Sequence, residues 1–210
     1  MDMADIASVT LEVDDTAAAR HFYTTAFGLD SQVRLRAAQE PTTGFRGFTL
    51  SLLVSQPADA KALYDAALEA GATSLKPAAK SLWGYGGVVQ APDGTIWQLA
   101  TSSKKDTGPA TREIEDIVLL LGVADVAATK RFYVDQGMTV GKSFGRTYVE
   151  FESGDDPVKL ALYRRRALGK VAGVPAEGSG SHRIVVNGGL GPCTDPDGFT
   201  WESVSSPALS

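Results

Sequence analysis

The sequence has few of the residues from which cross-linked and histidine-based sites are built. It contains one cysteine, Cys193, so no disulfide can form within the chain and nothing argues for an oxidising compartment. The residues beside Cys193 supply neither a base nor a cation, and we interpret it as a small loop residue rather than a reactive thiol. Of the two histidines, we interpret His21 as a solvent-side helix residue and His182 as a hydrogen-bonded structural residue.

Long apolar runs and excess positive charge are also missing. No run approaches the roughly 18 to 20 residues of a membrane span, and the acidic N-terminus, residues 1–5, lacks the apolar core of a signal peptide. The net charge of −5 gives no broad positive field for nucleic acid. The exception is the run Arg164–Arg166, which we interpret as a solvated strand edge, with an anion site as the alternative. We expect a cytoplasmic protein with no nucleic-acid or membrane partner.

What the sequence does contain is a tandem repeat. Residues 13–23 recur, with variations, as residues 123–133. Each copy follows an alternating strand, carries an aspartate placed to cap a helix, and ends in Phe-Tyr. A Pro-Asp-Gly turn followed by a tryptophan strand closes both halves, at residues 92–97 and 196–201. The preserved order of these elements indicates two related modules.

The module boundaries follow from composition. Residues 102–112 are polar and turn-rich, so we interpret them as a linker between a first module, 1–101, and a second, 113–210. Residues 55–70 have a helical pattern in the first module. The second module is predicted to be shorter and to lack this helix, because only residues 188–195 separate its last two strands.

Both halves resemble the βαβββ module of the vicinal oxygen chelate superfamily, which includes glyoxalase I, bleomycin-resistance proteins and extradiol dioxygenases. The resemblance covers nearly the whole chain and rests on the Val-x-Asp strand end before a Phe-Tyr helix and on the closing Pro-Asp-Gly pattern, each present twice. It implies an α+β fold in which two tandem βαβββ modules form curved mixed sheets that enclose a shared ligand-binding cavity.

The resemblance also implies positions for metal ligands, in the first and last strands of each module. These positions fall on Ser8 and Val118 in the first strands and on Gln98 and Glu202 in the last strands. A productive site needs about three protein ligands, whereas a serine hydroxyl is a poor ligand for a transition metal and valine has no donor atom. We therefore expect no metal cofactor; if one divalent ion is bound, its ligands are Gln98 and Glu202.

The cavity wall implied by the resemblance combines aromatic and apolar side chains with a few polar groups, which suits a small, partly apolar organic ligand. The candidate lining residues are Ser8, Thr10, Trp83, Tyr85, Gln98, Val118, Leu120, Tyr148, Glu150 and Glu202. For Trp83 and Tyr85 the alternative is a plug at the end of the sheet. Glu202 is the candidate catalytic proton acceptor or ligand anchor, and its alternative is a partly solvated strand-end carboxylate.

These observations favour two classes of function. The first is a metal-free binding protein of the sequestration or resistance type, which holds a partly apolar or aromatic small molecule between the modules. The second is a metal-dependent lyase, isomerase or dioxygenase of the glyoxalase type that uses Glu202 and Gln98. A third interpretation is a partner subunit with a filled cavity. The expected partner is a small organic molecule, and homodimer formation stays open.

Overall fold

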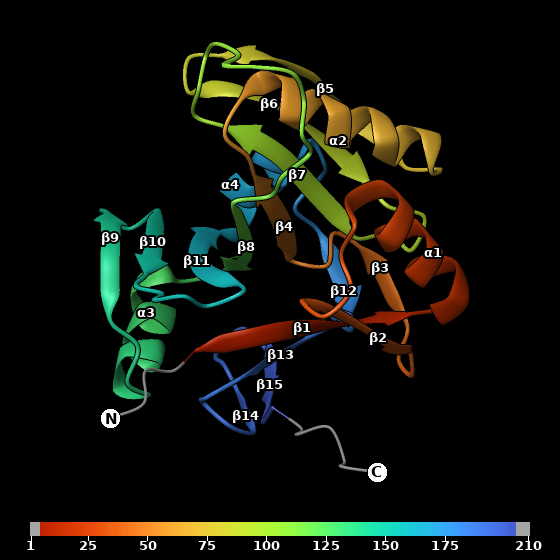
Figure 1. Cartoon of the computed structure of the whole chain (residues 1–210). Coiled ribbons are helices and arrows are strands. Elements are labelled where there is room, and N and C mark those ends of the chain that lie inside the picture. Colours follow the sequence, from red (N-terminus) through yellow and green to blue (C-terminus); the bar gives the residue numbers. More distant parts are fainter. Residues whose placement is uncertain (1–4, 205–210) are drawn as a thin grey trace.

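The computed structural model describes residues 5–204 of the chain. Residues 1–4 of the predicted acidic N-terminus and residues 205–210 of the predicted second module lie outside the described residues. Figure 1 shows a large sheet that curves across the molecule and a smaller sheet beside it. None of the helices in residues 5–204 has the length and apolar character needed to cross a membrane.

The large sheet consists of two βαβββ units joined edge to edge. Its strands, in spatial order, are β5 (Thr73–Ser81), β6 (Gly84–Gln90), β7 (Ile96–Thr101), β4 (Phe48–Leu53), β8 (Asp116–Val123), β11 (Lys159–Arg164), β10 (Tyr148–Phe151) and β9 (Val140–Phe144). The first unit is β4–α2–β5–β6–β7, with α2 at Pro57–Glu69, and the second is β8–α3–β9–β10–β11, with α3 at Val126–Asp135. In both units the first strand pairs parallel with the last, and β4 pairs antiparallel with β8 at the centre.

The small sheet is a shortened version of the large one. Its order is β14 (Cys193–Thr194), β15 (Thr200–Glu202), β13 (Ile184–Gly188), β1 (Ile6–Val13) and β2 (Val33–Ala37), with α1 (Thr16–Phe27) between β1 and β2. The strand directions repeat those of β6, β7, β4, β8 and β11 in the large sheet. A separate ribbon pairs β3 (Thr42–Gly44) with β12 (Gly178–Gly180).

Each half of the chain contributes to both sheets. The repeated pairs β1–α1 and β8–α3 belong to different sheets, and so do the closing strands β7 and β15. Within residues 5–204, α2 lies between β4 and β5, whereas β13 and β14 are joined without a helix. The mixed sheets and βαβββ units confirm the predicted α+β class. The division at residues 102–112 stays a prediction.

The repeated Phe-Tyr helices connect the two sheets. Asp15 caps α1 by accepting a 2.9 Å hydrogen bond from Ala18 N, so the helix begins where the sequence predicts. Tyr23 of α1 then packs on Trp97 of the large sheet, although α1 follows a strand of the small sheet. In the second half Tyr133 of α3 packs on Trp201 of the small sheet. One face of each sheet is therefore buried with the helices in a common core.

The predicted linker is held against α2. The Asp59 carboxylate accepts hydrogen bonds from the backbone N–H groups of Thr111, at 2.6 Å, and Arg112, at 3.2 Å. Burial alone raises the pKa of Asp59, but these hydrogen bonds outweigh burial and hold the pKa below its ordinary value. Residues 102–112 are thus fixed on the surface of α2 even though their composition is that of a turn-rich connection.

The face of the large sheet opposite the common core is partly covered by α4 (Arg165–Ala172). Leu168 and Ala172 of this helix form a second, smaller apolar cluster with Phe45, Val88 and Ile96. Because successive side chains of a strand point to opposite faces, this cluster lies on the other side of the sheet from Trp97 and the core. α4 therefore lies on the face that remains open to a ligand.

Candidate ligand-binding site

The open face of the large sheet contains a pocket of about 480 Å³, which we call the main pocket. It is lined by Ser51, Leu53, Gln98, Asp116, Val118, Leu120, Lys142, Tyr148, Glu150, Lys159, Tyr163, Leu168 and Val171. These residues come from six strands of the large sheet and from α4. Five predicted site residues meet here, and they are Gln98, Val118, Leu120, Tyr148 and Glu150.

The strand register sets a row of four residues across the floor of the main pocket. Ser51 of β4 lies opposite Gln98 of β7 on one side and opposite Val118 of β8 on the other. Lys159 of β11 lies opposite Val118 and completes the row. Gln98 Nε2 donates a 2.9 Å hydrogen bond to Thr49 Oγ1, which fixes the amide. The row therefore combines an amide, a hydroxyl, an apolar side chain and an ammonium group.

Two tyrosines, Tyr148 and Tyr163, line one side of the main pocket. Tyr148 lies between Phe144 and Tyr163, with ring centroids 5.9 and 5.5 Å away, and meets Tyr163 edge to face. The Tyr148 hydroxyl donates a 2.8 Å hydrogen bond to Glu150 Oε2. Burial and this hydrogen bond raise the pKa of Tyr148 well above its ordinary value. Tyr148 is therefore a protonated phenol whose hydrogen is directed at Glu150.

The charged side chains of the main pocket are paired with one another. Lys159 Nζ lies 2.7 Å from Asp116 Oδ1, and Lys142 Nζ lies 3.7 Å from Glu150 Oε1. Two cations thus balance two carboxylates around a floor that includes the apolar residue Leu120. Because no net charge is left over, this lining favours a neutral ligand over an ion.

The residues of the main pocket do not fit the metal site that the superfamily resemblance implies. In the central row Val118 offers no donor atom, and the Lys159 ammonium repels a cation. Within residues 5–204, no group of three or more histidine, cysteine, aspartate or glutamate side chains is arranged to hold a metal ion. Ser51 and Gln98 are the two remaining residues of the row, whereas a catalytic zinc site uses about three protein ligands.

Glu202, the predicted catalytic residue, lies in the other sheet from Gln98. Its Oε1 lies 2.9 Å from Arg36 Nη1, and Arg36 Nη2 in turn lies 2.7 Å from Glu12 Oε1. The Glu202 side chain is 47% exposed. The structure therefore places Glu202 in a surface ion-pair network and does not bring it together with Gln98.

Ser8 and Thr10 also lie in the small sheet. Both hydroxyls donate to Asn187 Oδ1, at 3.2 and 2.7 Å respectively. All three side chains are buried. On the face that corresponds to the main pocket, the small sheet thus carries a buried cluster in which the polar side chains are hydrogen-bonded to one another.

Trp83 and Tyr85 lie outside the main pocket. Trp83 is in the turn between β5 and β6 and is 83% exposed. Tyr85 packs against the common core on the opposite face of the large sheet. Sequence reasoning missed Ser51, Lys159 and Tyr163, which come from β4 and β11. A signal for β4 was available, because Leu63-Tyr64 occupies the place in α2 that Phe22-Tyr23 occupies in α1.

The histidines and the cysteine have structural surroundings. His182 lies with its two ring nitrogens 2.5 Å from Arg46 O and 3.0 Å from Asp197 O, and stacks on Phe199 at 3.9 Å. His21 is exposed on α1. Burial raises the pKa of the Cys193 thiol, which keeps it protonated. None of these three side chains lines the main pocket.

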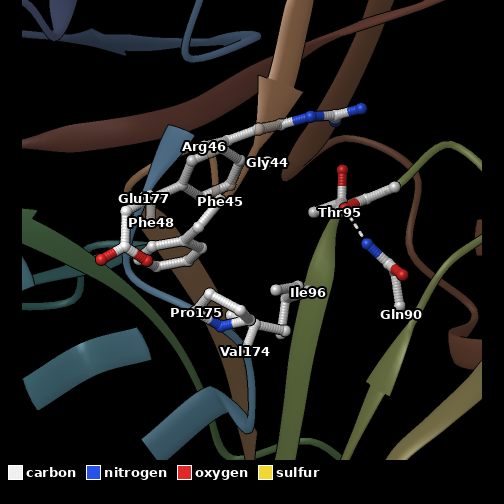
Figure 2. Close-up of a pocket in the computed structure, with 11 residues that line it drawn as sticks. Gly44, Phe45, Arg46, Phe48, Gln90, Thr95, Ile96, Val174, Pro175 and Glu177 are labelled. Atoms are coloured by element: carbon white, nitrogen blue, oxygen red, sulfur yellow. Dashed lines mark hydrogen bonds between the residues drawn. The ribbon is translucent and has the colours of Figure 1, made fainter. Parts of the chain in front are cut away.

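A second pocket, of about 340 Å³, lies beside the segment that follows α4 (Figure 2). Its walls include Phe48 and Ile96 from the large sheet and Phe45 from the segment between β3 and β4. Val174 and Pro175 contribute from the segment after α4. Arg46 extends along one side of this pocket (Figure 2). In the main pocket, by contrast, both lysines are paired with carboxylates. We call it the arginine pocket.

Comparisons with known proteins find similar structures but no similar sequence family. No family model matches the sequence, and no curated protein matches it. Glyoxalase I from Zea mays superposes with a TM-score of 0.58 at 15% identity, over 94% of this chain and 91% of the enzyme. A point variant of the same enzyme gives 0.60 at 15% identity, over 95% and 93%. A proposed dioxygenase from Bacillus subtilis gives 0.55 at 12% identity, over 89% and 71%.

These likenesses extend over nearly the whole of this chain and of the maize enzyme. They agree with the two joined βαβββ units and the curved mixed sheets described above. The predicted resemblance is therefore confirmed at the level of architecture, and the protein has a glyoxalase-like fold.

Proposed function

We propose that the protein binds a small, neutral, partly aromatic molecule in the main pocket and does so without a metal ion. The observation that carries this proposal is the row of residues across the four central strands of the large sheet, β7, β4, β8 and β11. The row consists of Gln98, Ser51, Val118 and Lys159. This row offers hydrogen bonds and apolar contact, and it lacks a set of metal ligands.

The surroundings of the row support the same class of ligand. Tyr148 and Tyr163 provide a wall on which a flat, apolar group can pack, and Leu120 provides an apolar floor. The Gln98 amide and the Ser51 hydroxyl can each donate and accept, so they suit an alcohol, phenol or amide. The ion pairs at Asp116 and Glu150 leave no free charge to attract an ion.

The alternative function, a metal-dependent reaction through Glu202 and Gln98, has no supporting geometry. The two side chains are in different sheets, and Glu202 is paired with Arg36. A ligand that used both residues would have to contact the large sheet and the small sheet at the same time. Binding in the main pocket involves the large sheet and α4 alone.

The proposal is tested with 2-naphthol as a neutral aromatic probe, by thermal shift and titration calorimetry. Binding raises the melting temperature because the probe stabilises only the folded state. Val171→Trp places an indole at the pocket wall and is expected to abolish binding, because Val171 lines the pocket from the exposed side of α4. Val134→Trp, on the exposed surface of α3, is the matched control and should bind as the wild type does.

A metal chelator should leave the affinity for 2-naphthol unchanged. Binding that is lost with the chelator and restored by Zn²⁺, Ni²⁺ or Mn²⁺ would contradict the metal-free proposal. Equal binding by Val171→Trp and the wild type would place the ligand elsewhere.

A further inference from the structure

The arginine pocket contains a partly buried cation that has no carboxylate partner. Arg46 Nη2 donates a 2.6 Å hydrogen bond to the backbone oxygen of Asp93, which is a neutral acceptor. Arg46 Nη1 is buried and has no hydrogen-bond partner among residues 5–204. No carboxylate of these residues lies within ion-pair distance of Arg46. Buried charges in proteins are normally paired, so this arginine is an unusual feature.

The nearby acid is engaged elsewhere. Asp93 Oδ2 accepts the hydrogen of Tyr23 at 2.6 Å, and Asp93 Oδ1 accepts from Thr95 N at 2.7 Å. Burial lowers the pKa of Arg46, the charge of Asp93 opposes this effect, and the neighbouring charge of Arg183 adds to it. Arg183 itself is ion-paired, because its Nη1 lies 2.7 Å from Asp14 Oδ1. Of these two neighbouring guanidinium groups, Arg46 is thus the one without a carboxylate at ion-pair distance among residues 5–204.

The wall around this cation is apolar in part, and one of its apolar residues, Phe45, is held in place by a neighbouring arginine. Phe45 is held by Arg165, whose Nη2 donates to the Phe45 carbonyl oxygen at 2.5 Å and whose guanidinium carbon lies 5.3 Å from the ring centre. Gly94 lets the guanidinium approach, because a Cβ there would lie 2.6 Å from Arg46 Nη2. Figure 2 shows the Glu177 carboxylate at the end of the pocket away from the Arg46 guanidinium.

We propose that the arginine pocket is a second binding site, for a small organic carboxylate whose apolar body packs against Phe45, Phe48 and Ile96 while its carboxylate binds Arg46. Arginine presents N–H donors in a planar fork that matches a carboxylate. The volume of about 340 Å³ accommodates a single aromatic ring with one acidic group. This site goes beyond the proposed function, because it is expected to prefer an anion, whereas the main pocket favours a neutral ligand.

The test uses benzoate, with benzamide as its neutral counterpart of nearly the same shape. Titration calorimetry should give benzoate an affinity at least about tenfold higher than that of benzamide, since a charge-assisted hydrogen bond contributes about 1.5–3 kcal/mol and 1.4 kcal/mol is a factor of ten. Arg46→Met is expected to remove this difference. Arg20→Met is the matched control, because Arg20 is exposed on α1 and should not affect it. Equal affinities for the two probes in the wild type overturn the proposal.

A second variant keeps the test decisive if Arg46→Met does not fold. Val174→Trp keeps Arg46 and fills the pocket from the segment after α4, and it should abolish benzoate binding. Unchanged benzoate binding by Val174→Trp overturns the proposal. Val171→Trp should still bind benzoate, and Val174→Trp should still bind 2-naphthol. The two sites can therefore fail or succeed independently.

Discussion

Tyr23 and Asp93, which are far apart in the sequence, are joined by a hydrogen bond of 2.6 Å from the phenol to the carboxylate. Trp97 Nε1 in turn donates to the Tyr23 hydroxyl at 3.4 Å. The second half repeats the arrangement with Tyr133, whose hydroxyl donates to Asp195 at 2.8 Å. Burial raises the pKa of both tyrosines well above the ordinary value, so each stays a hydrogen donor.

Removing either phenol hydroxyl should destabilise the fold. We expect Tyr23→Phe to lower the free energy of unfolding by about 1–2 kcal/mol, measured by urea denaturation. Tyr133→Phe should cost more, because Asp195 is 4% exposed whereas Asp93 is only partly buried. Tyr85→Phe is the control, since the Tyr85 hydroxyl makes no hydrogen bond within residues 5–204, and it should change stability little. A larger loss in Tyr23→Phe than in Tyr133→Phe would contradict this ranking.

Asp59 should make stability depend on pH in the acid range. Its folded pKa is lower than its unfolded value of about 3.9, so its contribution is complete above about pH 4 and is lost as pH falls through the folded pKa. Asp59→Asn should therefore lower the free energy of unfolding at pH 7 by about 1 kcal/mol and should flatten its decline below pH 4. Asp65→Asn, which removes a carboxylate exposed beside Lys61, should leave the acid decline nearly as it is in the wild type.

Gly84, the first residue of β6, should be sensitive to substitution. Its φ is +138°, and a Cβ there would lie 2.0 Å from the carbonyl oxygen of Thr101. We expect Gly84→Ala to lower the free energy of unfolding by about 3 kcal/mol, because backbone strain and the clash act together. Gly108→Ala, where a Cβ meets nothing within 4 Å, should be tolerated. Similar thermal unfolding of the two variants would show that the turn can adjust.

Glu202 should prove dispensable for the main pocket. Glu202→Gln is expected to change the free energy of unfolding by less than about 1 kcal/mol, because its ion pair with Arg36 is partly exposed. The affinity for 2-naphthol should be unchanged, since Glu202 belongs to the other sheet. Calorimetry that shows weaker binding in this variant would restore the direct role predicted from sequence.

The local features of the fold could be predicted from the sequence because they depend on nearby residues. Asp15 before an apolar helical pattern predicts the start of α1, and the structure places the cap there. The same reasoning applies to Asp125 and α3. The Phe-Tyr and Pro-Asp-Gly patterns are also short and local, so their duplication could be read from the sequence and indicates two related units.

The pairing of strands could not be predicted in this way. Alternation tells which side chains share a face of one strand, and it does not tell which strand lies beside it. Gln98 and Glu202 hold matching places in the two halves, but β7 and β15 belong to different sheets. Ser51 was missed because β4 has no Phe-Tyr helix after it, and its partner β8 is contributed by the other half of the chain.

The self-satisfied cluster of Ser8, Thr10 and Asn187 has a consequence for how the chain can vary. Under the proposed function the large sheet has to keep one face open to a ligand, whereas the small sheet has only to fold. We therefore expect substitutions in the small sheet to act through stability, and substitutions on the open face of the large sheet to act on binding as well.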